Sequence, residues 1–227
     1  MPGSNIPAAS HISRMLSNHR PGLYHAPLLP VGPDFPDGDL PGFQDRFQAL
    51  LADAENRYGP RDSSWNLLGL EVVPLGHPPA VATSPGAGKN CVLRIALDSA
   101  ESPDLLDWQL SHEVVHLLGP RSKEEITVFE EGVASYNQHR IRLAVHGRDA
   151  SFNQPQYADA FNLVRPWLDA YPDRVRQLRA TTGGGLSPLT HEALRATFPG
   201  MTSEISQALA AKFYPPRLPI SGPPALH

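Results

Sequence analysis

The stretch SPDLLDWQLSHEVVHLLG, residues 102–119, contains the start, the spacing and the end of one helix. Ser102 is a typical N-cap, Pro103 suits the first helical position, and Gly119 followed by a proline ends the helix. Apolar residues recur at helical spacing along one side, at Leu106, Leu110, Val114 and Leu117. The sequence therefore predicts one helix across this stretch.

Within this helix lies the pattern His112-Glu113-Val114-Val115-His116. Residues four apart lie about 400° round a helix and about 6 Å along it, so both imidazoles face one side and can bind one metal ion. Glu113 can reach a water molecule on that ion. From the chain's own composition, chance would produce this pattern about 0.02 times per chain. The pattern favours a metal site, and a helix whose histidines bind nothing is the alternative.

A zinc site built for hydrolysis needs a third protein ligand and an open position for water. Two known patterns do not supply that ligand here. In the metzincin pattern HExxHxxGxxH, Gly119 matches, but Ser122 occupies the position of the third ligand. A peptide-deformylase-like site would need a cysteine in a Cys-Leu-Ser context, whereas Cys91 stands in Lys-Asn-Cys-Val-Leu. The helix that follows the two histidines is the remaining source.

The segment FEEGVASY, residues 129–136, resembles the Asn-Glu-Gly-Phe-Ala-Ser-Tyr segment of aminopeptidase-N-like gluzincins. It is similar, more loosely, to the Asn-Glu-Ala segment of thermolysin-like enzymes, and the chain resembles the minigluzincins in size. The resemblance implies that Glu131 is the third metal ligand, beside His112 and His116, and that each chain binds one Zn2+. It also implies a zincin-like fold and a zinc metallopeptidase activity.

The chain departs from these families in its spacing, with fourteen residues between His116 and Glu131, fewer than in the large gluzincins, and at two further places. Ser135 stands where thermolysin-like enzymes have an aspartate that orients a histidine, so that carboxylate is either missing or supplied elsewhere. The region Gly86–Asn90 lacks the glutamate that aminopeptidase-N-like enzymes use, so an aminopeptidase is not favoured over an endopeptidase. Glu130 neighbours Glu131, but its side chain points about 100° away on a helix, and we expect it to be exposed.

Such a site would hydrolyse a peptide or protein substrate. Zinc would polarise the scissile carbonyl and lower the pKa of its water, and Glu113 would pass the water's proton to the leaving amine. We expect the substrate to pair with an edge strand formed by Cys91–Asp98. The oxyanion needs a further donor, for which Tyr157, His191 and Tyr214 are unranked candidates.

The rest of the chain predicts an α+β fold. A helix is expected over Phe43–Tyr58, the two best strands over residues 65–75 and 91–98, and a weaker strand over 80–83. The chain after Asp98 is expected to be helical almost to its end. Together these elements predict a small mixed or antiparallel sheet packed on the active-site helix, with a mostly helical C-terminal half.

The helix that carries Glu131 has its own expected boundaries. Ser122 with Glu125 forms a capping box, so we expect this helix to begin there and to run to Gly147. A tight Gly-Pro turn would then return it against the first helix. This arrangement would place the three expected metal ligands on two adjacent helices.

Composition limits the organisation and the partners of the chain. Prolines recur through residues 1–42 and 216–227, which we interpret as an arm and a tail around a single domain at 43–215. A net charge of −4 with scattered Lys and Arg argues against nucleic-acid and membrane-surface binding. A single cysteine allows no internal disulfide. We expect a monomer that is cytoplasmic by default, and leaderless secretion is compatible with the sequence.

Two other functions remain open from the sequence. The protein could be an inactive zincin-fold scaffold or binding protein with a structural metal, including a leaderless secreted effector. The proline-rich arms could instead bind a partner, with the domain as a platform. A related hypothesis is that the tail from Leu218 to His227 occupies the cleft and keeps the site latent.

Overall fold

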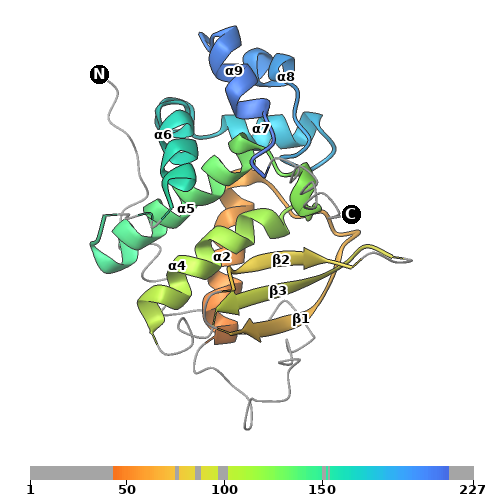
Figure 1. Ribbon diagram of the computed structural model, residues 1–227, viewed down its shortest axis with the longest axis vertical. Helices are drawn as coiled ribbons and strands as arrows, with labels where there is room; N and C mark the ends of the chain where they lie inside the picture. Colours follow the sequence, from red (N-terminus) through yellow and green to blue (C-terminus); the bar gives the residue numbers. More distant parts are fainter. Residues whose placement is uncertain are drawn as a thin grey trace, which may run out of the picture.

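The computed structural model describes residues 43–74, 77–84, 88–96, 102–149, 152 and 154–214 (Figure 1). The arm at 1–42 and the tail at 216–227 lie outside the described residues. The fold is α+β, as predicted, with a small mixed sheet followed by helices. In chain order the elements are α2 (Phe43–Tyr58), β1 (Asn66–Val73), β2 (Ala80–Thr83), β3 (Asn90–Ala96), α4 (Pro103–Leu117), the 3-10 helix η1 (Lys123–Glu125), α5 (Val128–His146), α6 (Pro155–Ala170), α7 (Arg174–Thr181), α8 (His191–Thr197) and α9 (Ser203–Ala210).

The three described strands form one sheet in the order β1-β3-β2. β1 is parallel to β3, whereas β2 is antiparallel to it, with Val81 opposite Leu93. The expectation that residues 91–98 form the substrate-facing edge is wrong, because β3 has a neighbour on each side. Its alternating pattern indicates a strand, but the order of strands depends on pairing with residues far away in the sequence. The edge near α4 is the short strand β2 (Figure 1).

The helix α2 packs its predicted apolar face into the core. Every residue of that face is at most 4% exposed, namely Phe43, Phe47, Leu50, Leu51, Ala54 and Tyr58. Leu93 and Ile95 of β3 and Leu110 and Val114 of α4 are fully buried in the same cluster. Burial of these side chains holds α4 between the sheet and the other helices, and each contributes roughly 1.5–3 kcal/mol.

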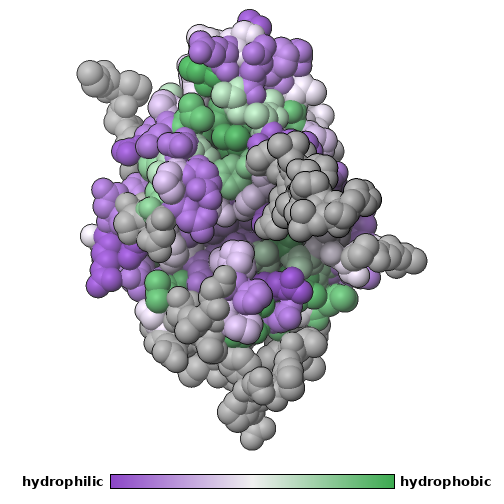
Figure 2. All heavy atoms as spheres, in the orientation of Figure 1, coloured by the Kyte–Doolittle hydropathy of each residue, from purple (hydrophilic) through white to green (hydrophobic). Residues whose placement is uncertain are grey.

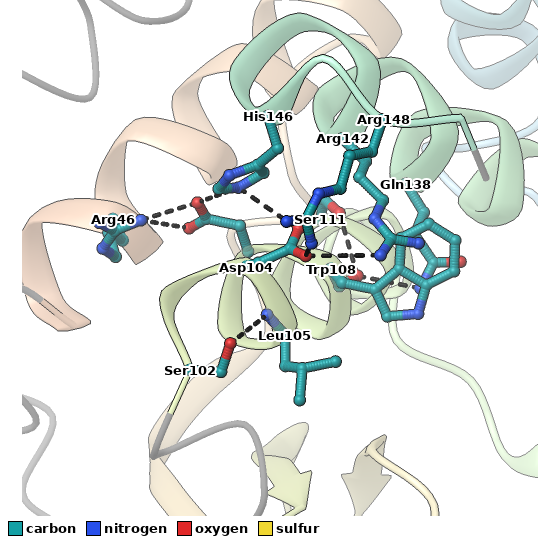
Figure 3. A network of polar contacts seen from close by, with 11 residues as sticks. Arg46, Ser102, Asp104, Leu105, Trp108, Ser111, Gln138, Arg142, His146 and Arg148 are labelled. Atoms are coloured by element: carbon teal, nitrogen blue, oxygen red, sulfur yellow. Dashed lines mark hydrogen bonds and ion pairs between the residues drawn. The ribbon is translucent and has the colours of Figure 1, made fainter. Parts of the chain in front are cut away.

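Charged side chains fasten the N-terminal half of α4 to two other helices (Figure 3). Ser102 caps the helix, as predicted, and accepts a hydrogen bond from the Leu105 N–H at 3.5 Å. The buried Asp107 carboxylate accepts two hydrogen bonds from Arg46 of α2, at 2.8 and 2.7 Å, and lies 3.0 Å from Nε2 of His146 on α5. These contacts fix the position of α4 relative to α2 and α5.

The helix α5 begins later than the sequence indicated. The capping box of Ser122 and Glu125 is present, but it caps the short η1, and Thr127 is the N-cap of α5. The later start depends on a residue far away in the sequence. Thr127 pairs with Lys212 in an isolated β-bridge, and Ile126 and Thr127 are extended just before α5 begins. The predicted end is confirmed, because Gly147 takes the left-handed φ of 63° that favours glycine after a helix.

The contact between α5 and α6 is close because of one glycine. A Cβ built at Gly132 would lie 2.7 Å from the Ala160 carbonyl oxygen and 2.9 Å from Cγ1 of Val164. A methyl group at position 132 would overlap both atoms, so α6 can approach α5 this closely only at a glycine. The residue after Glu131 thus determines how near α6 lies to the candidate site.

A buried arginine ties α7 to the ends of α2 and α4. The Arg179 guanidinium is 2% exposed and donates hydrogen bonds to the carbonyls of Tyr58, Gly59, Pro60, Leu118 and Gly184, at 2.6–2.9 Å. Burial lowers the pKa of Arg179 to about 10, against the raising effect of Glu130 and more distant acids. Satisfied donors make this buried charge tolerable.

The described surface is mixed in polarity. On the face in Figure 2, apolar residues show mainly where α6, α7 and α9 meet, and hydrophilic residues cover the outer ends of these helices. The large exposed apolar side chains of the described residues, Leu68, Leu143 and Leu163, belong to three different elements. Within the described ranges, we find no helix with the length and apolar character needed to cross a membrane.

Candidate metal centre

Three ligand-type side chains converge between α4 and α5. His112 and His116 lie one turn apart on α4, and Glu131 lies in the first turn of α5, as the sequence predicted. The Glu131 Oε2 atom is 3.1 Å from Nε2 of His112 and 3.8 Å from Nε2 of His116. The two Nε2 atoms are 3.3 Å apart, and all three residues are buried. The structure therefore brings together the three residues that the sequence singled out.

These distances match what a tetrahedral zinc ion requires of its ligands. With Zn–N and Zn–O distances of about 2.0–2.2 Å, two ligands on a tetrahedron are separated by about 3.3 Å. The three donor separations of 3.1, 3.3 and 3.8 Å lie around this value. Two imidazoles and one carboxylate are also a donor set that zinc favours. The residues thus fit such an ion without a change of backbone.

Electrostatics favours positive charge at this point. Burial alone would raise the pKa of the Glu131 carboxyl, but the two histidines, His116 foremost, hold it well below its ordinary value. Burial would likewise lower the pKa of His116, yet Glu131 and Glu130 raise it well above 6.5. Each shift has the same cause, which is a pair of carboxylates facing imidazoles in a buried space. A divalent cation can take the place of the proton in this arrangement.

Glu130 lies in the site, although we expected it to be exposed. It is 2% exposed, and its Oε1 lies 2.7 Å from Nδ1 of His116. The prediction was wrong because other elements cover α5 on nearly every side along residues 129–138. The carboxylate that the sequence lacks at Ser135 is therefore supplied from a different position on the helix.

The contact with Glu130 fixes how His116 presents itself. When the neutral ring donates its Nδ1–H to the carboxylate, Nε2 is the nitrogen left to bind an ion, and it lies 3.3 Å from Nε2 of His112. Two successive glutamates in a segment that is otherwise largely apolar were the signal in the sequence. That signal could have suggested two buried carboxylates, whereas we expected one ligand and one solvated neighbour.

Glu113 faces the same space from α4. It is 3% exposed, and the Val81 N–H of β2 donates to its carboxylate. Its Oε2 atom has no hydrogen-bond partner within the described part of the chain. Burial raises the pKa of Glu113, and the neighbouring His112 and His116 offset part of this effect. A buried carboxylate with one free oxygen beside the ligands suits a proton acceptor.

Of the three candidate oxyanion donors, two lie at the site and one does not. The Tyr157 ring meets the His112 ring edge-on with centroids 5.9 Å apart, and its hydroxyl lies 2.7 Å from that of Tyr214. Burial raises the pKa of Tyr157 to about 12, so this hydroxyl keeps its proton at neutral pH. His191 begins α8, pairs with the adjacent Glu192 at 2.7 Å and does not line the cleft.

The site opens into a cleft of about 410 Å³. The residues that line the cleft include Ala80 and Val81 of the edge strand β2, several residues of α4, and Tyr157 and Tyr214. Cys91 takes no part, since it is buried within β3 with its Sγ 3.7 Å from the Asn66 carbonyl oxygen, as expected of a small core residue. The cleft gives access to Glu113 and to the ligand atoms together.

Comparison with known proteins identifies no relative of this chain. No protein-family model, curated protein or solved structure matches it. The function must therefore be argued from the residues of the site.

Proposed function

We propose that this protein is a zinc-dependent metallopeptidase of the zincin-like, gluzincin type. His112, His116 and Glu131 would hold one Zn2+, and Glu113 would serve as the general base. The observation that carries the proposal is the tetrahedral spacing of the three donor atoms, 3.1–3.8 Å apart, beside a buried carboxylate with a free oxygen. The likeness of residues 129–136 to a gluzincin segment supports it independently.

Each residue of the cleft has a chemical task under this proposal. Bound zinc supplies Lewis acidity, which polarises the scissile carbonyl and lowers the pKa of the attacking water. Glu113 accepts the proton of that water on its free Oε2 and donates it to the leaving nitrogen. The protonated hydroxyl of Tyr157 can donate to the oxygen on which negative charge develops, whereas the Tyr214 hydroxyl already contacts Tyr157 and Glu131. Glu130 holds the His116 ring in place.

The wall formed by β2 suits an extended peptide. Among the described residues β2 is paired with β3 on one side only, so its outer edge can pair with an added strand wherever its backbone groups are not already used, as the Val81 N–H is by Glu113. Main-chain pairing of this kind gives affinity with little sequence preference. A peptide lying there would bring its backbone carbonyl toward Glu113, which already accepts from the Val81 N–H. Peptide bonds are therefore the substrate class that the cleft favours.

Metal content and peptide cleavage test the proposal together. Metal per chain is measured by mass spectrometry for the wild type, Glu131→Ala and Glu113→Gln, and a peptide library is screened with each. We expect about one zinc in the wild type and in Glu113→Gln, markedly less in Glu131→Ala, and cleavage by the wild type alone.

Two results would contradict the assignment. Equal zinc in all three proteins, or none in any, would remove the metal site. Full zinc with no cleavage of any peptide by the wild type would instead favour the scaffold with a structural metal.

A further inference from the structure

The two ends of the cleft differ in charge. Leu105, Trp108 and Phe152 line the end beside the first turns of α4, which is apolar and aromatic. Beyond His116 the chain turns at Gly119-Pro120 and brings Arg121 and Lys123 to the other end. The cleft therefore runs from an aromatic end to a basic end, with the candidate metal centre between them.

The Arg121 guanidinium is positioned by backbone rather than by an acid. Its Nε donates to the Ser187 carbonyl oxygen at 2.8 Å. A Cβ at Gly185 would lie 2.8 Å from its terminal nitrogen, so this glycine leaves room for the guanidinium. Ser187 in turn receives the Thr127 N–H at 3.0 Å, which links Arg121 to the start of α5. Arg121 is thus held in one place with terminal N–H groups left to donate.

Lys123 stands over an aromatic ring of the site. Its Nζ lies 4.2 Å from the centroid of the Tyr214 ring, whose hydroxyl contacts Tyr157. Neither Lys123 nor Arg121 forms an ion pair with an acidic side chain in the part of the chain that the structure describes. Arg46 and Arg140, by contrast, are paired with Asp107 and Asp53. Arg121 lowers the pKa of Glu125 through space but forms no ion pair with it, so both cations keep donors that suit a carboxylate ligand.

The position of such a carboxylate is limited on both sides. Glu113, Glu130 and Glu131 would repel it at the centre of the cleft, so it is favoured only at the basic end. The chain of contacts from Lys123 through Tyr214 and Tyr157 to His112 is at most about 18 Å long, and an extended peptide covers that length in about five residues.

We propose that Arg121 and Lys123 bind a carboxylate of the peptide substrate within about five residues of the cleaved bond. The carboxylate belongs either to an Asp or Glu side chain or to the C-terminus of the peptide. The proposal rests on the proposed peptidase function and adds a substrate class to it, namely peptides that carry negative charge on the side facing Arg121.

Matched peptides test this inference by binding as well as by cleavage. Fluorescent peptides are made in pairs that differ only by Glu or Gln at one position. The varied position is each of the five on either side of the cleaved bond in turn. Every peptide is made with a free and with an amidated C-terminus. Binding is measured by fluorescence anisotropy to Glu113→Gln protein, which retains the cleft. Cleavage is measured as kcat/KM with protein that keeps Glu113. The variants are Arg121→Gln and Lys123→Gln, with Arg195→Gln as control, since Arg195 is exposed on α8 and outside the cleft.

We expect the Glu peptide to bind about tenfold more tightly than the Gln peptide at one position. Arg121→Gln and Lys123→Gln should each remove most of this ratio, whereas Arg195→Gln should keep it. A preference that depends only on the free C-terminus would identify the terminal carboxylate as the group bound. Equal binding of Glu, Gln, free and amidated peptides would overturn the inference even if the protein cleaves peptides. If nothing is cleaved, the peptidase function fails, and the binding ratios still decide whether Arg121 and Lys123 bind carboxylates.

Discussion

The Glu130 carboxylate should set the zinc affinity of the site although it binds no metal itself. Its Oε1 lies 2.7 Å from Nδ1 of His116, and both side chains are at most 7% exposed. A hydrogen bond to a charged group contributes roughly 1.5–3 kcal/mol, and one to a neutral group roughly 0.5–1.5 kcal/mol. Glu130→Gln keeps the shape and loses the charge, so it should weaken zinc binding by about 1–1.5 kcal/mol, which is about tenfold in Kd.

Removal of the side chain should cost more than removal of its charge. Glu130→Ala leaves the Nδ1–H of His116 buried without an acceptor, which adds about 1–3 kcal/mol and brings the loss in zinc affinity toward a hundredfold. The other carboxylate oxygen of Glu130 has no partner among the described residues, so Gln breaks no second hydrogen bond. The metal-free protein also loses the charge that raises the pKa of His116, so the loss in zinc affinity is compared with the change in the free energy of unfolding of the metal-free protein.

The assay is competition of the protein with a zinc-binding dye. The matched control is Glu124→Gln, which removes the same charge from an exposed position on η1. The titration is run at two pH values. Because Glu130 also raises the pKa of His116, protonation of His116 competes more strongly with zinc at low pH when Glu130 is present. The loss should be larger at the higher pH. Zinc affinities of Glu130→Gln and Glu124→Gln that both equal the wild type would refute the reasoning.

Two substitutions and one labelling experiment test the packing of the fold. Gly132→Ala should lower the free energy of unfolding by about 1–3 kcal/mol in urea, because the new methyl group meets the Ala160 carbonyl; a gain in stability, as helix propensity alone predicts, would contradict this contact. Arg179→Ala should cost at least about 3 kcal/mol in the same titration, since five carbonyls lose their donor, and Arg176→Ala on the same helix should cost under about 1 kcal/mol. Cys91 is 1% exposed and burial raises its pKa to about 11, so a thiol reagent at pH 8 should label it only as the protein unfolds; rapid labelling of native protein would show that β3 is accessible.

Local patterns in the sequence were sufficient to predict the position of α4. The cap at Ser102, the proline after it and the spacing of His112 and His116 are all set within one stretch of chain, and the structure has the helix where they place it. Glu131 was found through a family resemblance, which carries long-range information in a short segment. The cap and the boundaries of α4 are predictable because each is decided by a residue and its near neighbours in sequence.

The features that were missed all depend on distant residues. β3 became the central strand because β1 and β2 both pair with it, and its own alternation does not reveal this. The start of α5 moved to Thr127 because Lys212, eighty-five positions later, holds that residue in a bridge. The burial of Glu130 required α4 to lie against α5 on the side that helical geometry assigned to solvent. In each case the local pattern was present and its surroundings decided the outcome.

The hydrogen bonds of Arg179 bear on how far this protein could be shortened. Its acceptors belong to three separate stretches, at residues 58–60, 118 and 184, and the first two close the ends of α2 and α4. A fragment that kept α4 and α5 but stopped before α7 would lack Arg179. The carbonyls at residues 58–60 and 118 would then be either buried without a donor or exposed to water. The site is therefore not a portable module of residues 102–147. Transplanting it into another scaffold would require a substitute for one distant guanidinium as well as for the five acidic and imidazole side chains of the candidate site.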